Sequence, residues 1–164
     1  MRHLKKTLLV AALLVVGACT SPGQYGNSSD ANLGAGDASN PSSPAYFRQT
    51  VGDRVLFVVN QSSLTDEARA TLNGQVAWLN ANPEYDALIE GHADERGTRE
   101  YNLALGARRA NAVQEYLLSQ GIAASRLQVV SYGKERPVAI CSDDSCYSQN
   151  RRAVTVISAG GLSS

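Results

Sequence analysis

Residues 91–111 read GHADERGTREYNLALGARRAN, and the rest of the chain is organised around this stretch. It begins where the apolar pair Leu88-Ile89 ends, passes through a short polar loop built on Gly97, and enters a long helical pattern. A strand end, a loop and a helix start form a rim that can present charged side chains at fixed positions. The stretch therefore predicts a helix packed on a sheet, with a polar site near the start of that helix.

Helical spacing divides this stretch into faces. The residues expected to pack on the sheet recur at intervals of three or four: Leu103, Ala107, Ala110, Val113 and Leu117. Asn102, Leu105 and Arg109 form a stripe beside that face, at the edge of the helix–sheet contact. Asp94, in the preceding loop, can approach the same edge. A carboxylate, an amide and a guanidinium gathered there suit a small zwitterion. Asp94 would bind the ammonium of such a ligand, and Arg109 would bind its carboxylate. The alternative is an ordinary ion pair between a surface Asp and a structural Arg.

Three runs carry a family resemblance: GHADERGTREYNLALGARRANAVQEYL, VSYGKERP and NRRAV. Together they resemble the signature of the OmpA-like peptidoglycan-binding domain, over roughly Val51 to Ile157. The resemblance implies a non-enzymatic binding domain whose ligand is the diaminopimelate of uncrosslinked peptidoglycan stems. It implies that Asp94 and Arg109 hold the amine and carboxylate of that ligand.

The resemblance reaches three further positions. Phe57 matches a family aromatic, but Val58 follows it where relatives usually carry an acid, so only Phe57 is carried over. In the basic turn before the last strand, Arg151 or Arg152 is expected to reach a stem-peptide carboxylate, and Arg152 is the residue we assign. A solvated surface pair is the alternative for these two arginines.

The N-terminus predicts export and lipidation. Residues 1–18 contain three basic groups of the Lys and Arg type and no acid, followed by an apolar run too short to span a bilayer. The run ends VGAC, which resembles a lipobox, so residues 1–18 are the expected signal peptide and Cys19 the expected site of diacylglycerol and N-acyl modification. Thr20, where an Asp would suggest inner-membrane retention, implies the periplasmic face of the outer membrane. The alternative is a plain secretory signal with an incidental Cys.

Charge and cysteines agree with this assignment. Without its first 18 residues the chain carries 12 basic and 15 acidic groups, a net charge of −3, which argues against a nucleic-acid partner. If Cys19 carries lipid, Cys141 and Cys146 remain as a pair, and an oxidising compartment favours their disulfide. Metal ligation by these cysteines is the alternative.

Composition and periodicity divide the chain into segments. Residues 19–48 are poor in apolar side chains and are expected to form a flexible linker, residues 49–160 the folded domain, and residues 161–164 a frayed tail. The expected strands span residues 55–59, 85–92, 127–131 and 153–158. One expected helix begins after Ser62 or Thr65, and a second spans about residues 99–119. This order predicts an α+β, two-layer sandwich with two long helices on one face of a small mixed sheet.

Two chemical alternatives rest on few residues. Glu90, His92 and Asp94 alternate along a strand, but His92 is the only histidine after the signal peptide, so we expect no metal site and expect His92 to hold the loop by hydrogen bonds. No serine lies in a Gly-x-Ser-x-Gly elbow, so a hydrolase is not expected.

The resulting hypothesis is a lipoprotein that tethers the outer membrane to peptidoglycan. The resemblance implies TolB and other components of the Tol system as partners, in envelope integrity and cell division. Two rival hypotheses are an OmpA-like domain serving a secretion or motility complex and a periplasmic enzyme acting on stem peptides.

Overall fold

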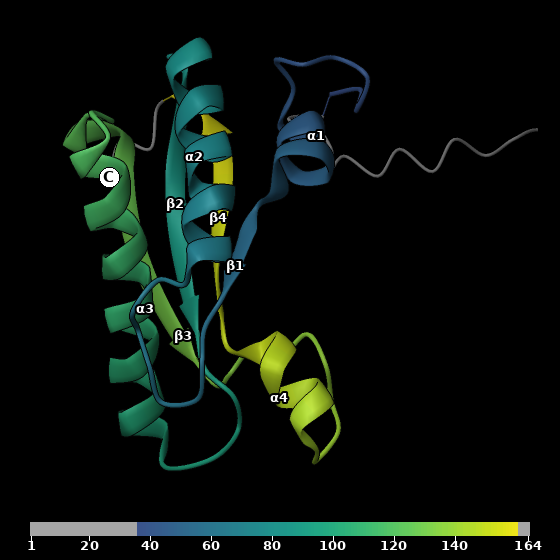
Figure 1. The fold of residues 1–164 in the computed structure, drawn as a ribbon, viewed down its shortest axis with the longest axis vertical. Helices are drawn as coiled ribbons and strands as arrows, with labels where there is room; N and C mark the ends of the chain where they lie inside the picture. Colours follow the sequence, from purple (N-terminus) through teal and green to yellow (C-terminus); the bar gives the residue numbers. More distant parts are fainter. Residues whose placement is uncertain (1–35, 161–164) are drawn as a thin grey trace, which may run out of the picture. The chain divides into compact units, whose positions relative to one another are not determined.

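The computed structural model describes residues 36–160. Four strands form one sheet in the order β1-β4-β2-β3 (Figure 1). Their bounds are Arg54–Leu56 for β1, Tyr85–His92 for β2, Leu127–Gly133 for β3 and Arg152–Ala159 for β4. β2 and β3 pair in parallel, and β4 lies antiparallel between β1 and β2. The sheet is therefore mixed, as expected.

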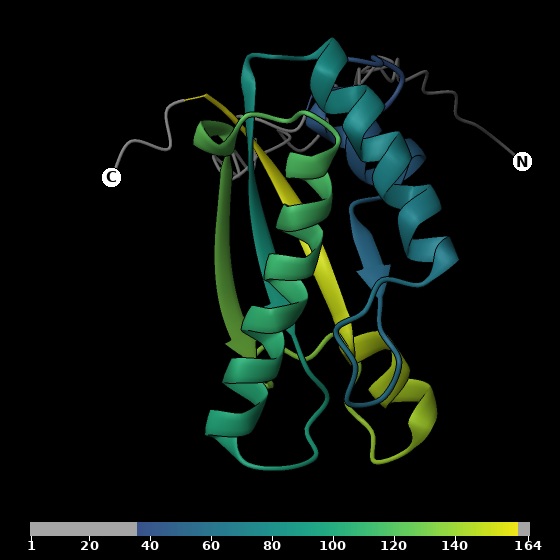
Figure 2. The same cartoon turned by 60° about the vertical axis from the view of Figure 1, so that its left-hand side comes forward.

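Two long helices cover one face of this sheet. Helix α2 (Asp66–Ala81) and helix α3 (Arg99–Ser119) lie side by side over the strands (Figures 1 and 2). The remaining elements are short: α1 (Pro44–Tyr46), the π-helical turn η1 (Phe47–Gly52), the 3-10 turn η2 (Ala124–Arg126) and α4 (Asp144–Asn150). This architecture confirms the α+β two-layer sandwich. Within residues 36–160 no helix has the length and apolar character needed to cross a membrane.

Local signals account for both long helices. The hydroxyl of Thr65 accepts a hydrogen bond from the amide of Ala68 and caps α2, and the hydroxyl of Thr98 caps α3 in the same way. Beyond the end of α3, Gly121 has a φ of +91°, the left-handed conformation expected of a residue that closes a helix. Both helix positions agree with the sequence-based prediction.

The buried face of α3 differs from the prediction. Its buried residues are Asn102, Leu105, Gly106, Arg109, Ala110, Val113 and Leu117. Leu103, expected against the sheet, is 45% exposed. The helix is rotated toward its polar stripe because Gly106 lies against the backbone of Gly91 in β2, where neither residue has room for a side chain. Asn102 and Arg109 are therefore inside the helix–sheet contact and not at its rim.

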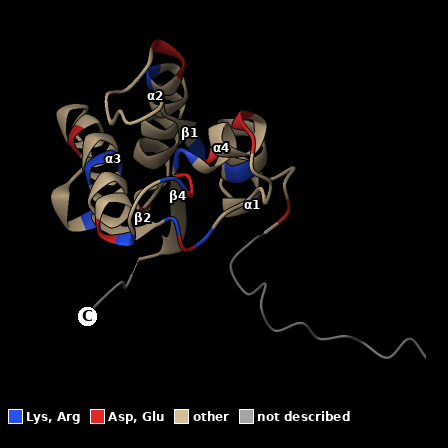
Figure 3. Cartoon of the chain, turned by 90° about the horizontal axis from the view of Figure 1, so that it is seen from below, with Lys and Arg blue, Asp and Glu red and all other residues tan. Residues whose placement is uncertain are grey.

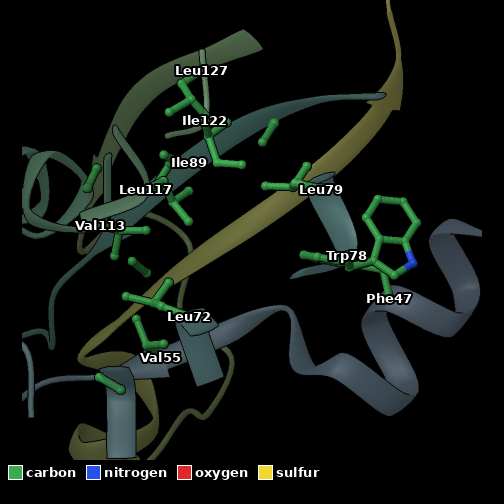
Figure 4. Close-up of a cluster of buried hydrophobic side chains, with 14 of the residues drawn as sticks. Phe47, Val55, Leu72, Trp78, Leu79, Ile89, Val113, Leu117, Ile122 and Leu127 are labelled. Carbon is green, nitrogen blue, oxygen red and sulfur yellow. The ribbon is translucent and has the colours of Figure 1, made fainter. Parts of the chain in front are cut away.

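The hydrophobic core extends further toward the N-terminus than expected. Phe47 is completely buried, and its ring packs edge-on against Trp78 with 4.9 Å between centroids (Figure 4). The indole Nε1 of Trp78 donates to the carbonyl of Pro41 at 2.7 Å. Folded packing thus begins before residue 49, because two adjacent aromatics in a Ser- and Pro-rich segment, Tyr46 and Phe47, pack on the core. Cys19 and residues 161–164 lie outside the described part of the chain.

Two other features depart from the predicted elements. The first strand ends at Leu56 instead of residue 59, and Val58 and Val59 are exposed in the loop that follows it. Helix α4 was not predicted, since its sequence DSCYSQN has no apolar periodicity. A disulfide joins Cys141 to Cys146, with 5.7 Å between their Cα atoms, and confirms the expected pairing.

Candidate functional site

Asp94 occupies the loop that follows β2 and is 7% exposed. Its carboxylate accepts hydrogen bonds from Nη2 of Arg96 at 2.7 Å and from the Arg96 amide at 3.2 Å. Nη1 of Arg151, which precedes β4, lies 3.4 Å from the same carboxylate. We refer to Asp94, Arg96, Arg109 and Arg151 as the Asp94 site. It brings together three segments that are far apart in the sequence.

Arg109 is completely buried in α3. Its guanidinium donates to three backbone carbonyls: Gln61 at 2.9 Å, His92 at 2.7 Å and Val58 at 3.3 Å. Its central carbon lies 5.2 Å from the centroid of the Phe57 ring. Arg109 therefore ties the loop after β1 to the end of β2, and Phe57 lies beside it as the resemblance implies. Three of the five guanidinium N–H groups are used in this way, so two remain that can donate to another acceptor.

The electrostatics of the Asp94 site favour an anion. Burial works to raise the pKa of Asp94, but the hydrogen bonds and charge of Arg96, with a further bond from Arg151, outweigh burial and keep that pKa below its usual value. Burial lowers the pKa of Arg109 to about 10, the charge of Asp94 opposes that change, and the charge of Arg151 adds to it. Three guanidinium groups thus face the carboxylate of Asp94 and that of Asp144, which bonds Arg151 at 3.3 Å. One more carboxylate would balance the charge.

The structure assigns Asn102 and Leu105 supporting positions. The side-chain amide of Asn102 is 1% exposed and donates to the carbonyl of Arg96 at 2.8 Å. It holds the loop that carries Arg96 and does not point its donors at solvent. Leu105 is 3% exposed and contributes apolar packing. Both expected site residues lie next to the Asp94 site, but neither presents a free polar group to a ligand.

The sequence offered Arg151 and Arg152 as candidate ligand contacts in the basic turn, and the structure places Arg151 at the Asp94 site. Arg152 begins β4, where alternation along the strand turns its side chain to the face opposite the helices. There Arg152 is 4% exposed, and its Nη2 donates to the carbonyl of Arg136 at 3.1 Å. The structure therefore does not bring Arg152 together with Asp94 and Arg109.

His92 forms a separate buried site. It is 2% exposed, its Nε2 lies 3.6 Å from the carboxylate of Glu90, and neither ring nitrogen has a hydrogen-bond partner within residues 36–160. We treat the approach to Glu90 as a weak contact, since it exceeds hydrogen-bonding distance. The expectation that the His92 side chain holds the loop is wrong; its backbone carbonyl does so through Arg109. Burial, reinforced by the charges of Arg152 and Arg136, lowers the pKa of His92 to about 4.

Metal ligation finds little support among the described residues. One group there has suitable atoms close together, Cys141, Asp143 and Cys146, and its two cysteines are joined in the disulfide. A disulfide sulfur is not a thiolate ligand. The cysteine pair therefore serves structure.

Sequence reasoning missed the contribution of α4. Tyr147 lies under the guanidinium of Arg96, with 4.5 Å from its ring centroid to the central carbon of the arginine. Asp144 reaches Arg151 from the first turn of the same helix. Arg96 was likewise not among the residues that the sequence assigned to the site. The one available signal was the pair Asp143-Asp144 ahead of a tyrosine, since Asp is a favoured residue at a helix start.

Two open hollows flank the Asp94 site. The larger, about 700 Å³, runs along β1 and the start of α2 and includes Phe57 and Arg151 in its lining. The smaller, about 250 Å³, lies beside the disulfide and includes Ala93 and Glu95. Viewed from this end of the molecule, basic and acidic segments are distributed over several elements (Figure 3). The larger hollow thus gives a ligand at the Asp94 site room to extend along β1.

Comparison with known proteins defines the class. The family model described as OmpA family matches residues 56–151, and the chain belongs to this family. The C-terminal domain of MotB from Helicobacter pylori has a TM-score of 0.61, with 18% identity over 66% of this chain and 86% of that one. At that identity the likeness concerns the fold alone.

Three more similar relatives share one name, peptidoglycan-associated lipoprotein. The protein of this name from Mesorhizobium japonicum is 50% identical over 94% of this chain and 92% of its own length. That from Haemophilus influenzae is 41% identical over 94% of this chain and 98% of its own. The crystal structure of the Burkholderia pseudomallei protein has a TM-score of 0.66 and 38% identity, covering 71% of this chain and all of that one. These names describe lipoproteins associated with peptidoglycan, in agreement with the expectation of a non-enzymatic protein.

Proposed function

We propose that this protein is a lipoprotein of the outer membrane that binds peptidoglycan non-covalently, through the diaminopimelate of uncrosslinked stem peptides. The observation that carries the proposal is the Asp94 site, where a buried carboxylate is surrounded by three guanidinium groups. Membership of the OmpA family and the name of the relatives support peptidoglycan as the ligand.

The chemistry of the ligand matches this arrangement. The free end of an uncrosslinked diaminopimelate side chain carries one ammonium and one carboxylate. The carboxylate of Asp94 can accept hydrogen bonds from the ammonium. The ligand carboxylate can accept from the remaining N–H groups of Arg109 or from Arg151, so that each charge of the zwitterion meets a group of opposite charge.

Two parts of the proposal rest on sequence and family alone. The lipobox-like end of the signal peptide and the word lipoprotein in the relatives' names support acyl chains on Cys19, which would hold the protein at the periplasmic face of the outer membrane. The family resemblance supports exchange between peptidoglycan and TolB within the Tol-Pal system. In that role the protein couples the envelope layers during division.

Co-sedimentation of the protein with purified sacculi tests the proposed ligand. Wild type should pellet with sacculi, and Asp94→Asn should stay largely in solution, because the amide cannot neutralise the ligand ammonium. Glu95→Gln is the matched control, since Glu95 is adjacent and exposed, and it should pellet like wild type. If Asp94→Asn pellets as well as Glu95→Gln, the site assignment is wrong. If soluble fragments are released from the sacculi, the protein is an enzyme and the binding proposal fails.

A further inference from the structure

Helix α4 and the loop before it form a small unit that is fastened at both ends. At the base, the side chain of Asn150 accepts from the amides of Val138 at 2.9 Å and Ala139 at 3.2 Å and donates to the Ala139 carbonyl at 2.8 Å. At the tip, the Cys141–Cys146 disulfide joins the end of the loop to the first turn of α4. We call residues 137–150 the stapled unit.

The tip of the stapled unit touches the Asp94 site. Asp144 bonds Arg151 and the ring of Tyr147 lies under Arg96, so both arginines that bond Asp94 also contact α4. These two residues flank Cys146 in the sequence, two positions before it and one after it. The disulfide therefore fixes the part of α4 that supports the arginines, whereas Asn150 fixes the other end.

A helix of this length needs such support. With seven residues, α4 is too short to be stable by itself, and its first turn depends on the side chain of Asp143, which accepts from the amide of Ser145 at 2.8 Å. Without the disulfide, the base held by Asn150 should persist, while the turn that carries Asp144 should fray. Arg96, whose side chain is 46% exposed, would then lose the surface that orients it.

We propose that the Cys141–Cys146 disulfide is a positioning device for ligand binding: it holds Asp144 and Tyr147 of α4 in place, and these two orient Arg151 and Arg96 around Asp94. Cys141 and Cys146 act through other residues and do not touch the ligand. The proposal rests on the proposed function, because it assigns a role in binding at the same site.

The first test measures α4 directly, without any ligand. In the double variant Cys141→Ser/Cys146→Ser, the backbone amide of Tyr147, which donates to the carbonyl of Asp143 at 3.1 Å, should exchange hydrogen with solvent about tenfold faster than in wild type, whereas the amide of Arg151, next to the base held by Asn150, should change less. Amides of α3 should keep their wild-type rates. Unchanged exchange in α4 would overturn the proposal whatever the ligand proves to be.

The second test measures binding of a soluble stem tripeptide that contains meso-diaminopimelate. The double cysteine variant should bind roughly fivefold more weakly than wild type, as expected for loss of a cation–π contact and of ordered side chains. Ser142→Ala, in the same loop, is the matched control and should bind like wild type.

A third variant separates positioning from a general structural effect. In a protein that already carries Asp144→Asn and Tyr147→Leu, the same cysteine replacements should weaken binding by less than about twofold, because the contacts through which the disulfide acts are gone. An undiminished fivefold loss in that background, or equal binding by wild type and the cysteine variant, would overturn the proposal. If wild type itself does not bind the tripeptide, the proposed function fails and this inference fails with it.

Discussion

Replacing Arg109 with alanine should destabilise the fold as well as remove a candidate ligand contact. The Arg109 side chain is completely buried and donates to three backbone carbonyls, two in the loop after β1 and one at the end of β2. In Arg109→Ala the buried carbonyl of His92 would lose this donor, and the carbonyls of Val58 and Gln61 would lose theirs at a partly buried position. The loop after β1 and the end of β2 would lose the group that joins them.

The change in the free energy of unfolding caused by Arg109→Ala is the sum of opposing contributions. Hydrogen bonds from a charged donor contribute about 1.5–3 kcal/mol each, so three contribute roughly 4.5–9 kcal/mol. Against this, burial lowers the pKa of Arg109 from its ordinary range to about 10, which corresponds to an unfavourable contribution of about 3 kcal/mol that alanine would remove. The cavity left by the side chain adds a further loss. We expect a net decrease of about 3–5 kcal/mol in the free energy of unfolding.

Urea-induced unfolding measures this decrease, followed by the fluorescence of Trp78, the single tryptophan of the chain. Arg108→Ala is the matched control, because Arg108 is adjacent on the same helix and exposed, and it should change the free energy of unfolding by less than about 0.5 kcal/mol. If Arg109→Ala falls within about 1 kcal/mol of wild type, the assignment of Arg109 as a structural tie is wrong.

Three further predictions concern stability. The pKa of His92 is about 4 in the folded protein and 6.5 ordinarily, so the unfolded chain takes up a proton first as the pH falls. Stability should therefore decrease between about pH 6.5 and 4, by up to roughly 3 kcal/mol, and urea titrations should show a flatter pH dependence in His92→Asn. Gly91→Ala should lower the melting temperature by more than about 10 °C, since its new methyl group would meet the backbone of Gly106; a smaller change would show that α3 can shift away. Phe47→Ala should cost about 3–5 kcal/mol in urea unfolding, and a loss below 1 kcal/mol would place the start of the folded domain after residue 47.

Much of the fold could be predicted because its signals are local. The caps at Thr65 and Thr98 and the glycine after α3 mark both long helices. The rotation of α3 could not be predicted, because it depends on the contact between Gly91 and Gly106, residues on different elements. Apolar periodicity assumes that leucines point inward, yet Leu103 points outward.

The candidate site was predicted in outline and not in its details. The sequence indicated Asp94 and Arg109 as neighbours, with Phe57 beside them. It did not indicate that backbone carbonyls take three donors of Arg109. Nor did it separate Arg151 from Arg152, because the choice depends on which residue begins β4.

The central claim is that the Asp94 site recognises a zwitterion, and calorimetric titration with two stem tripeptides tests it most directly. One tripeptide carries meso-diaminopimelate and the other carries L-lysine at the same position, which keeps the ammonium and lacks the side-chain carboxylate. The diaminopimelate peptide should bind at least about tenfold more tightly, because without the carboxylate the arginine donors of the site lack an acceptor. Equal affinity of the two peptides would contradict the claim.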